Sequence, residues 1–186
     1  MEKNTAPDNV HTQLYSLSGE SWPAGLVDIT ERLVIREFRI DESEICREIF
    51  RECGSFMPGD NPGDLSREEF LEFHRAYIKY QYGFYGYGNF GIFLKAPACS
   101  SIDECIQRSG TCIGLVGLIN GSASQTGELS YAILPPYRMQ GYAYEACSAA
   151  LEYGRECGFE RFEARISPDN AASAALAEKL GIDILR

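Results

Sequence analysis

The chain has 186 residues, of which 45% are hydrophobic and 24% are charged; this is enough for one globular domain and excludes wholesale disorder. Acidic residues outnumber basic residues by 27 to 17, which gives a formal net charge of −10. This charge disfavours nucleic-acid binding, which depends on Lys and Arg against phosphates, and mildly favours cationic substrates.

The first part of the chain is predicted to contain an arm, a strand and a helix. Residues 1–28 have no hydrophobic periodicity, and we interpret them as an arm that is partly disordered or laid along the surface. Apolar residues alternate along residues 31–38 and predict the first strand. Asp41 and Glu44 have the spacing of a capping box, which predicts the start of a helix.

A second helix and a strand are predicted before residue 95. Ser66 and Glu69 form another expected capping box. Gly86-Tyr-Gly-Asn-Phe-Gly91 matches the dinucleotide-binding pattern G-x-G-x-x-G, but that mechanism needs a strand before the pattern and a helix after it. Here a helix precedes and a strand follows, so we interpret the pattern as a bend. Residues 96–110 then read as an excursion between two strands.

The second half of the chain is predicted to alternate strands and helices. Residues 112–119 and 128–134 should form a hairpin, because Asn120-Gly121 between them favours a turn. The remaining predicted elements are a helix over 141–157, a strand over 162–166, a helix over 171–180 and a strand over 182–185. This order predicts a mixed α/β (α+β) fold with a mostly antiparallel centre.

Targeting and metal-binding signals are weak. No run approaches the roughly 18 apolar residues of a membrane span, and residues 1–20 lack the apolar core of a secretory signal. The seven cysteines include no Cys-x-x-Cys pair, and His11 and His74 are isolated. We therefore expect a cytoplasmic protein with reduced thiols, no metal site and no membrane contact.

The strongest functional pattern is a strand, a short loop and a helix over residues 131–143. The strand must end at Pro135-Pro136, and the loop opens directly into a helix at Gly141. Successive loop amides and the helix N-terminus would converge on one spot and create an anion site. Gly141 permits close approach of a phosphate, and Arg138 adds positive charge. The alternative is an ordinary turn with a glycine at the helix start.

This loop resembles the [R/Q]-x-x-G-x-[G/A] pyrophosphate loop of the GNAT acetyltransferase superfamily, with Arg138, Gly141 and Ala143 at the motif positions. Further motifs, in the same order, resemble its RimJ/RimL-like branch; they are Thr30-Glu-Arg-Leu-Val-Ile-Arg36, Glu145, Asn170-Ala-Ala-Ser173 and Glu178-Lys-Leu-Gly181. The resemblance spans residues 30–182.

The resemblance implies a GNAT domain over residues 29–186, with a mostly antiparallel central sheet that is splayed at the acetyl-CoA site and flanked by helices. The family normally closes with two strands after the last helix, whereas only one is expected here. A missing strand would leave a sheet edge open, so we expect either a homodimer whose partner covers this edge or a fragment of a longer chain.

The implied activity is acetyl-CoA-dependent N-acetylation. The acetyl group would pass directly to a primary amine in a ternary complex, and the acceptor would be a protein N-terminus or a small amine. A backbone amide of the strand over 131–134 would polarise the thioester carbonyl. The alternative function is a non-catalytic CoA-binding module with a regulatory or structural role.

Two residues are candidate catalytic groups. Glu128 could accept a proton from the amine directly or through water, although a solvated charge at a strand start is the plainer interpretation. For Ser173 the resemblance implies a hydrogen bond to the leaving thiolate, against a plain position on the helix surface. Glu145 is interpreted as packing behind the loop. The predicted acetyl-CoA-binding residues are Ile133, Leu134, Arg138, Met139, Gln140, Gly141, Tyr142, Ala143, Asn170 and Ser173.

Overall fold

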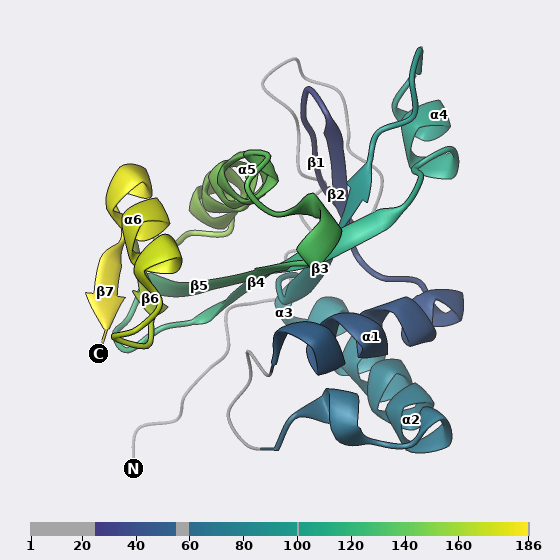
Figure 1. Cartoon of the computed structure of the whole chain (residues 1–186), viewed down its shortest axis with the longest axis horizontal. Helices are drawn as coiled ribbons and strands as arrows, with labels where there is room; N and C mark the ends of the chain where they lie inside the picture. The colour runs from purple at the N-terminus through teal and green to yellow at the C-terminus, as the bar shows by residue number, and fades with distance from the viewer. Residues whose placement is uncertain (1–24, 55–59, 100, 186) are drawn as a thin grey trace.

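A single seven-stranded sheet organises the computed structural model, which describes residues 25–54, 60–99 and 101–185 (Figure 1). The strands lie side by side in chain order. They are β1 (Leu26–Ile29), β2 (Leu33–Arg36), β3 (Asn89–Leu94), β4 (Cys112–Asn120), β5 (Thr126–Ile133), β6 (Arg161–Arg165) and β7 (Asp183–Leu185). Neighbours from β1 to β5 are antiparallel, whereas β6 is parallel to β5 and β7 is parallel to β6. The predicted mixed α/β class with a mostly antiparallel centre is confirmed.

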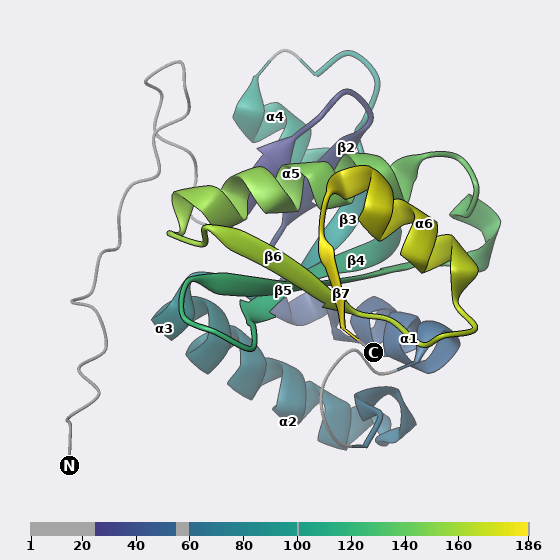
Figure 2. The ribbon, with the colours of Figure 1, turned by 90° about the vertical axis from the view of Figure 1, so that its left-hand side faces the viewer.

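Helices cover both faces of this sheet. The α-helices are α1 (Ser43–Cys53), α2 (Arg67–Tyr77), α3 (Gly83–Tyr85), α4 (Ile102–Gln107), α5 (Tyr142–Glu156) and α6 (Ala171–Leu180). Short 3-10 turns are η1 (Ile40–Glu42), η2 (Pro62–Asp64) and η4 (Pro135–Tyr137), and a π-helical turn, η3 (Ile78–Tyr82), joins α2 to α3. Figure 2 shows α5 and α6 on one face of the sheet, with α1 and α2 on the other.

The alternation of side chains along the strands divides the core into two layers. Leu33 and Ile35 of β2 belong to the cluster that packs under α5, whereas Val34 between them belongs to the cluster under α1 and α2. In β5, Leu129 and Ile133 face α5, whereas Ala132 faces α1. Along β5, odd-numbered residues therefore point their side chains toward α5, and even-numbered residues point theirs toward α1.

One element corrects the sequence analysis, and a second adds a helix to it. Residues 26–28, assigned to the arm, form most of β1, because Leu26 and Val27 are buried against the sheet. The remainder of that prediction, residues 1–24, lies outside the described residues. The excursion over 96–110 contains the helix α4, in which the Ser101 hydroxyl accepts a hydrogen bond from the backbone N–H of Glu104. A six-residue helix with one buried side chain has too little periodicity to be recognised.

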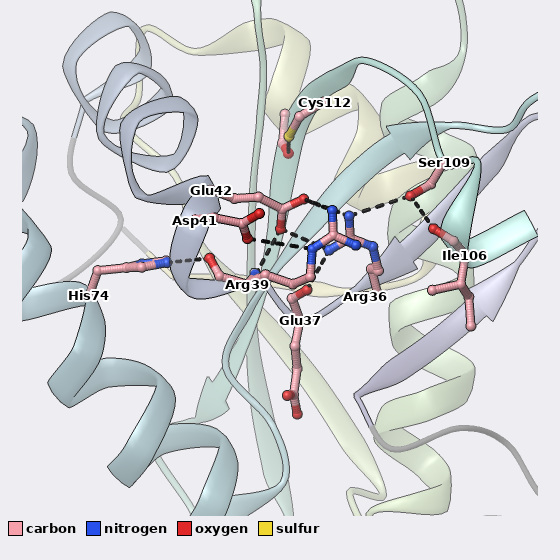
Figure 3. Close-up of polar contacts among 10 residues, drawn as sticks. Arg36, Glu37, Arg39, Asp41, Glu42, His74, Ile106, Ser109 and Cys112 are labelled. Atoms are coloured by element: carbon pink, nitrogen blue, oxygen red, sulfur yellow. Dashed lines mark hydrogen bonds and ion pairs between the residues drawn. The ribbon is translucent and has the colours of Figure 1, made fainter. Parts of the chain in front are cut away.

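The start of α1 differs from its predicted capping box, whereas the box of Ser66 with Glu69 is present at α2. Instead of Asp41 and Glu44, the carboxylate of Glu42 accepts a hydrogen bond from the backbone N–H of Arg39, at 2.7 Å (Figure 3). The same carboxylate pairs with the guanidinium of Arg36 at 2.7 and 2.9 Å. Arg36 is only 5% exposed, so it needs this carboxylate as a buried counter-charge.

Candidate functional site

The neighbouring parallel strands β5 and β6 diverge. β5 pairs with β6 only from Thr126 to Glu128, although it continues to Ile133. On its other side β5 stays paired with β4, and the Leu134 N–H donates to the Ile113 carbonyl at 2.9 Å. Because donors alternate in direction along an antiparallel ladder, the backbone groups of Tyr131 and Ile133 point away from β4, into the space left by β6.

A cavity of about 140 Å³ occupies this divergence. Tyr131 of β5 lines it from one side, and Asn170 and Ser173 line it from the start of α6. The hydroxyl oxygens of Tyr131 and Ser173 lie 3.0 Å apart, and either group can donate. Burial raises the pKa of Tyr131 above its ordinary value, against the lowering effect of the hydrogen bond with Ser173. The phenol therefore stays protonated at neutral pH and is a possible proton donor.

Asn170 has a structural role within this group. Its Oδ1 accepts a hydrogen bond from the Ser173 N–H at 3.1 Å and caps α6. Its side-chain amide donates to no residue in the described part of the chain, so that amide faces no competing protein partner. Asn170 can therefore cap α6 through its Oδ1 and contact a ligand through its side-chain amide at the same time.

The loop between β5 and α5 has an unusual backbone. Met139 and Gly141 both have left-handed conformations, with φ of +61° and +83°. The N–H groups from Met139 to Tyr144 find no acceptor within the described ranges. Unpaired N–H groups and the positive end of the helix dipole attract an anion, so this helix start can hold a phosphate.

Arg138 is held by protein groups along one edge. Its Nε donates to the Ile133 carbonyl at 2.8 Å, and its Nη2 lies 3.6 Å from the Cys53 sulfur. Its Nη1 has no partner among residues 25–54, 60–99 and 101–185. One edge of the guanidinium is therefore left for an anion. Sequence reasoning missed Cys53, which lies 85 positions away in the chain.

The other predicted binding residues surround the same loop. Ile133 is buried at the end of β5, and Leu134 packs partly buried toward α1. The Gln140 side-chain amide donates to the Pro136 carbonyl at 3.0 Å. In the first turn of α5, Tyr142 and Ala143 pack partly buried against the core under that helix.

Glu128 is separated from the pair of Tyr131 and Ser173. Leu129 and Tyr131 face the α5 side of the sheet, so Glu128 projects from the opposite side. Its side chain is 20% exposed, and one carboxylate oxygen lies 3.6 Å from Arg165. The structure thus places the two candidate catalytic residues on opposite faces of the sheet at the start of the divergence.

Glu145 connects the helix start to the turn between β1 and β2. Its carboxylate accepts hydrogen bonds from the Thr30 hydroxyl, the Arg32 backbone N–H and the Arg32 guanidinium. Burial alone would raise the pKa of Glu145, but these hydrogen bonds and the charge of Arg32 hold it below the ordinary value. This network explains why the motifs at 30–36 and 138–145, far apart in sequence, occur together.

Two further properties of the described residues bear on the class of site. None of the helices there is both long enough and apolar enough to cross a membrane. In the same ranges, no three His, Cys, Asp or Glu side chains are grouped to hold a metal ion.

Comparison with known proteins identifies the domain. Residues 32–183 match the family described as the acetyltransferase (GNAT) domain. The uncharacterized N-acetyltransferase YnaD of Bacillus subtilis is 30% identical over 89 residues, which are 47% of this chain and 49% of YnaD. The chain thus spans about half the length of the curated relatives it matches.

Two solved structures have a similar fold. An acetyltransferase (GNAT family) from Bacillus anthracis has a TM-score of 0.56 at 24% identity, covering 82% of this chain and 81% of its own. RimL, a ribosomal L7/L12 alpha-N-protein acetyltransferase, has a TM-score of 0.57 at 15% identity, covering 83% of this chain and 78% of its own. The match across residues 32–183, with the splayed sheet and the loop before α5, shows that this chain belongs to the acetyltransferase (GNAT) domain family.

Proposed function

We propose that this protein transfers the acetyl group of acetyl-CoA to a primary amine. The observation that carries the proposal is the divergence of β5 and β6. It opens a cavity beside backbone groups of Tyr131 that have no partner within the described ranges. The loop at the end of the same strand leads to an anion-accepting helix start. Acetyl-CoA carries its thioester at one end of a long arm and its phosphates at the other, so it needs both the cavity and the helix start.

The residues of the chain divide the chemistry between them. The N–H groups from Met139 to Tyr144 hold phosphates, and Nη1 of Arg138 adds charge. The backbone N–H and C=O of Tyr131 and the N–H of Ile133 orient the arm, whereas the Ile133 C=O is already bound by Arg138. One of these N–H groups polarises the thioester carbonyl. Binding both substrates side by side itself lowers the barrier, because it removes the entropic cost of their meeting.

Two proton transfers accompany the exchange of a C–S bond for a C–N bond. Glu128, from the α1 side of the sheet, accepts the proton that the attacking amine loses, directly or through water. On the α5 side, the pair of Tyr131 and Ser173 donates a hydrogen bond or a proton to the departing thiolate. The placement of the two groups on opposite faces supports amine entry from one side and acetyl-CoA entry from the other.

The acceptor is either a protein N-terminus or a small amine. The RimJ/RimL-like motifs and the likeness to RimL favour a protein N-terminus, whereas the net charge of −10 also suits a small polycation. We also propose a cytoplasmic location, and a homodimer in which a second copy covers β7, because β7 is the last strand on its side of the described sheet.

Release of free thiol from acetyl-CoA tests the proposal. The assay compares peptides with free N-termini, polyamines and amino sugars as acceptors, with the same compounds N-acetylated as matched controls. We expect thiol release with at least one free amine and none with its acetylated form. Binding of CoA without turnover on any amine would support the non-catalytic CoA-binding module instead.

A further inference from the structure

The loop before α5 is held in a conformation that its own residues do not favour. Met139 adopts a left-handed backbone with φ of +61°, which brings the Cβ of a non-glycine residue too close to the backbone. Its side chain is 97% exposed, so packing does not compensate for this strain. Contacts other than those of the Met139 side chain must therefore stabilise the loop.

Arg32 supplies such a contact. Its Nη1 donates to the carbonyl of Gln140, the residue between the two left-handed positions, at 2.9 Å. Its guanidinium also lies over the ring of Tyr142, 4.4 Å from the ring centroid. In a planar trans peptide the C=O and the following N–H point in opposite directions. Because the Gln140 carbonyl points to Arg32, the N–H of Gly141 points away from Arg32.

Glu145 fixes the orientation of Arg32 itself. Its Oε2 lies 2.7 Å from Nε and 2.6 Å from Nη2 of Arg32, and its Oε1 accepts the Arg32 backbone N–H at 2.9 Å. The Thr30 hydroxyl donates to the same carboxylate. The positive charge of Arg32 is thereby balanced, so its effect on the loop comes from geometry more than from net charge.

We propose that Arg32 is a positioning residue for phosphate binding: it orients the Gln140–Gly141 peptide so that the Gly141 N–H faces the phosphates of acetyl-CoA. This inference rests on the proposed function, because it takes the loop to be the phosphate site. Arg32 acts through the peptide and does not itself touch the phosphates. It preorganises the loop, so that binding does not have to select a rare conformation.

The first test compares Arg32→Ala with wild type by calorimetric titration with CoA and by steady-state kinetics. We expect about a tenfold weaker affinity for CoA, from the loss of one hydrogen bond with a charged donor. The KM for acetyl-CoA should rise by a similar factor, whereas kcat and the KM for the amine should change little. Arg155→Ala is the matched control, because Arg155 also forms an exposed ion pair on α5, at 2.7 Å from Glu152, far from the loop.

A second variant distinguishes positioning of the loop by Arg32 from direct attraction of the phosphates by its charge. If Arg32 offsets the cost of the left-handed Met139, then Met139→Gly should recover roughly two- to fivefold of the affinity lost in Arg32→Ala. The same change should give a smaller gain when Arg32 is present, because the loop is then already ordered. Equal gains in both backgrounds would overturn the positioning role. If Arg32→Ala fails to fold, Arg32→Lys replaces it and should also weaken CoA binding, since a lysine has no planar fork to span Glu145 and the Gln140 carbonyl.

Failure of this inference and failure of the proposed function are distinguishable. A wild-type protein that binds no CoA would refute the phosphate site and the inference with it. A wild-type protein that binds CoA, together with a folded Arg32→Ala variant of equal affinity, would overturn the role of Arg32 alone.

Discussion

At Gly141 the backbone combines a left-handed φ of +83° with a position beside the unpaired N–H groups of the loop. A Cβ added there would lie 3.3 Å from Nη2 of Arg32. Gly141→Glu would add bulk and negative charge where phosphates approach, so we expect it to abolish CoA binding, as measured by calorimetry. Gly158→Glu is the matched control: its φ is +94°, with nothing within 4 Å of the added Cβ, at the far end of α5. Unchanged CoA affinity in a folded Gly141→Glu variant would refute the site.

Ser173 should matter for turnover more than for binding. Its hydroxyl contacts Tyr131 across the cavity, and its proposed partner carries charge only as the thiolate leaves. Ser173→Ala should lower kcat by roughly 10- to 100-fold, the value of one hydrogen bond to a charged group, with little change in CoA affinity. Ser167→Ala, at another serine that lines the cavity, is the control. A wild-type kcat in Ser173→Ala would assign this hydroxyl to the helix surface.

At the scale of residues, the sequence predicts the site where the parts are close in the chain. Gly141, Arg138 and the helix start form one short motif, and the structure places them together. The contacts of Glu145 with Arg32 and of Arg138 with Cys53 span 113 and 85 positions. Only the pairing of β1, β2 and α1 with the rest of the fold brings them together, and no local pattern encodes that.

At the scale of elements, the junction between β2 and α1 depends on one buried ion pair. The pKa of Glu42 stays below its ordinary value of 4.5, because the hydrogen bonds and charges of Arg36 and Arg39 outweigh the effect of burial, which alone would raise it. Glu42→Gln leaves the Arg36 charge buried without a counter-ion, so we expect a loss of about 3 kcal/mol in the free energy of unfolding at pH 7. Urea denaturation measures this loss.

The same ion pair sets a pH dependence. A carboxylate with a depressed folded pKa contributes its stability above its unfolded pKa and loses it as pH falls through the folded pKa. The difference in unfolding free energy between wild type and Glu42→Gln should therefore be complete above about pH 4.5 and shrink at lower pH. A difference that stays constant down to pH 2 would show that Glu42 acts through packing alone.

Elements with strong local signals were predictable, and those that depend on distant partners were not. The helix α2 has its capping box at Ser66, and α5 and α6 end at glycines, as their sequences indicate. β1 is only four residues long, and its inclusion in the sheet depends on pairing with β2. The π-turn after α2 was not predictable from a local pattern either. It places Tyr82 in a stack with Phe90 of β3, with 5.7 Å between the ring centroids, and this contact forms only in the folded chain.

At the scale of the whole molecule, the net charge of −10 would act on the two proposed substrates in opposite directions. The summed field would attract a polycationic amine, whereas it would repel the phosphates of acetyl-CoA up to the proposed phosphate site at the N–H groups of the loop. Salt weakens both long-range effects, since the Debye length falls to about 8 Å at physiological ionic strength.

We therefore expect added salt to change the two Michaelis constants with opposite signs. The KM for a polyamine acceptor should rise several-fold between low and physiological ionic strength, because screening removes an attraction that grows with the charge of the amine. The KM for acetyl-CoA should fall, because screening removes a repulsion. A monoamine of similar shape is the control and should respond less than the polyamine. If salt leaves the KM of the polyamine unchanged, the negative net charge does not steer the acceptor.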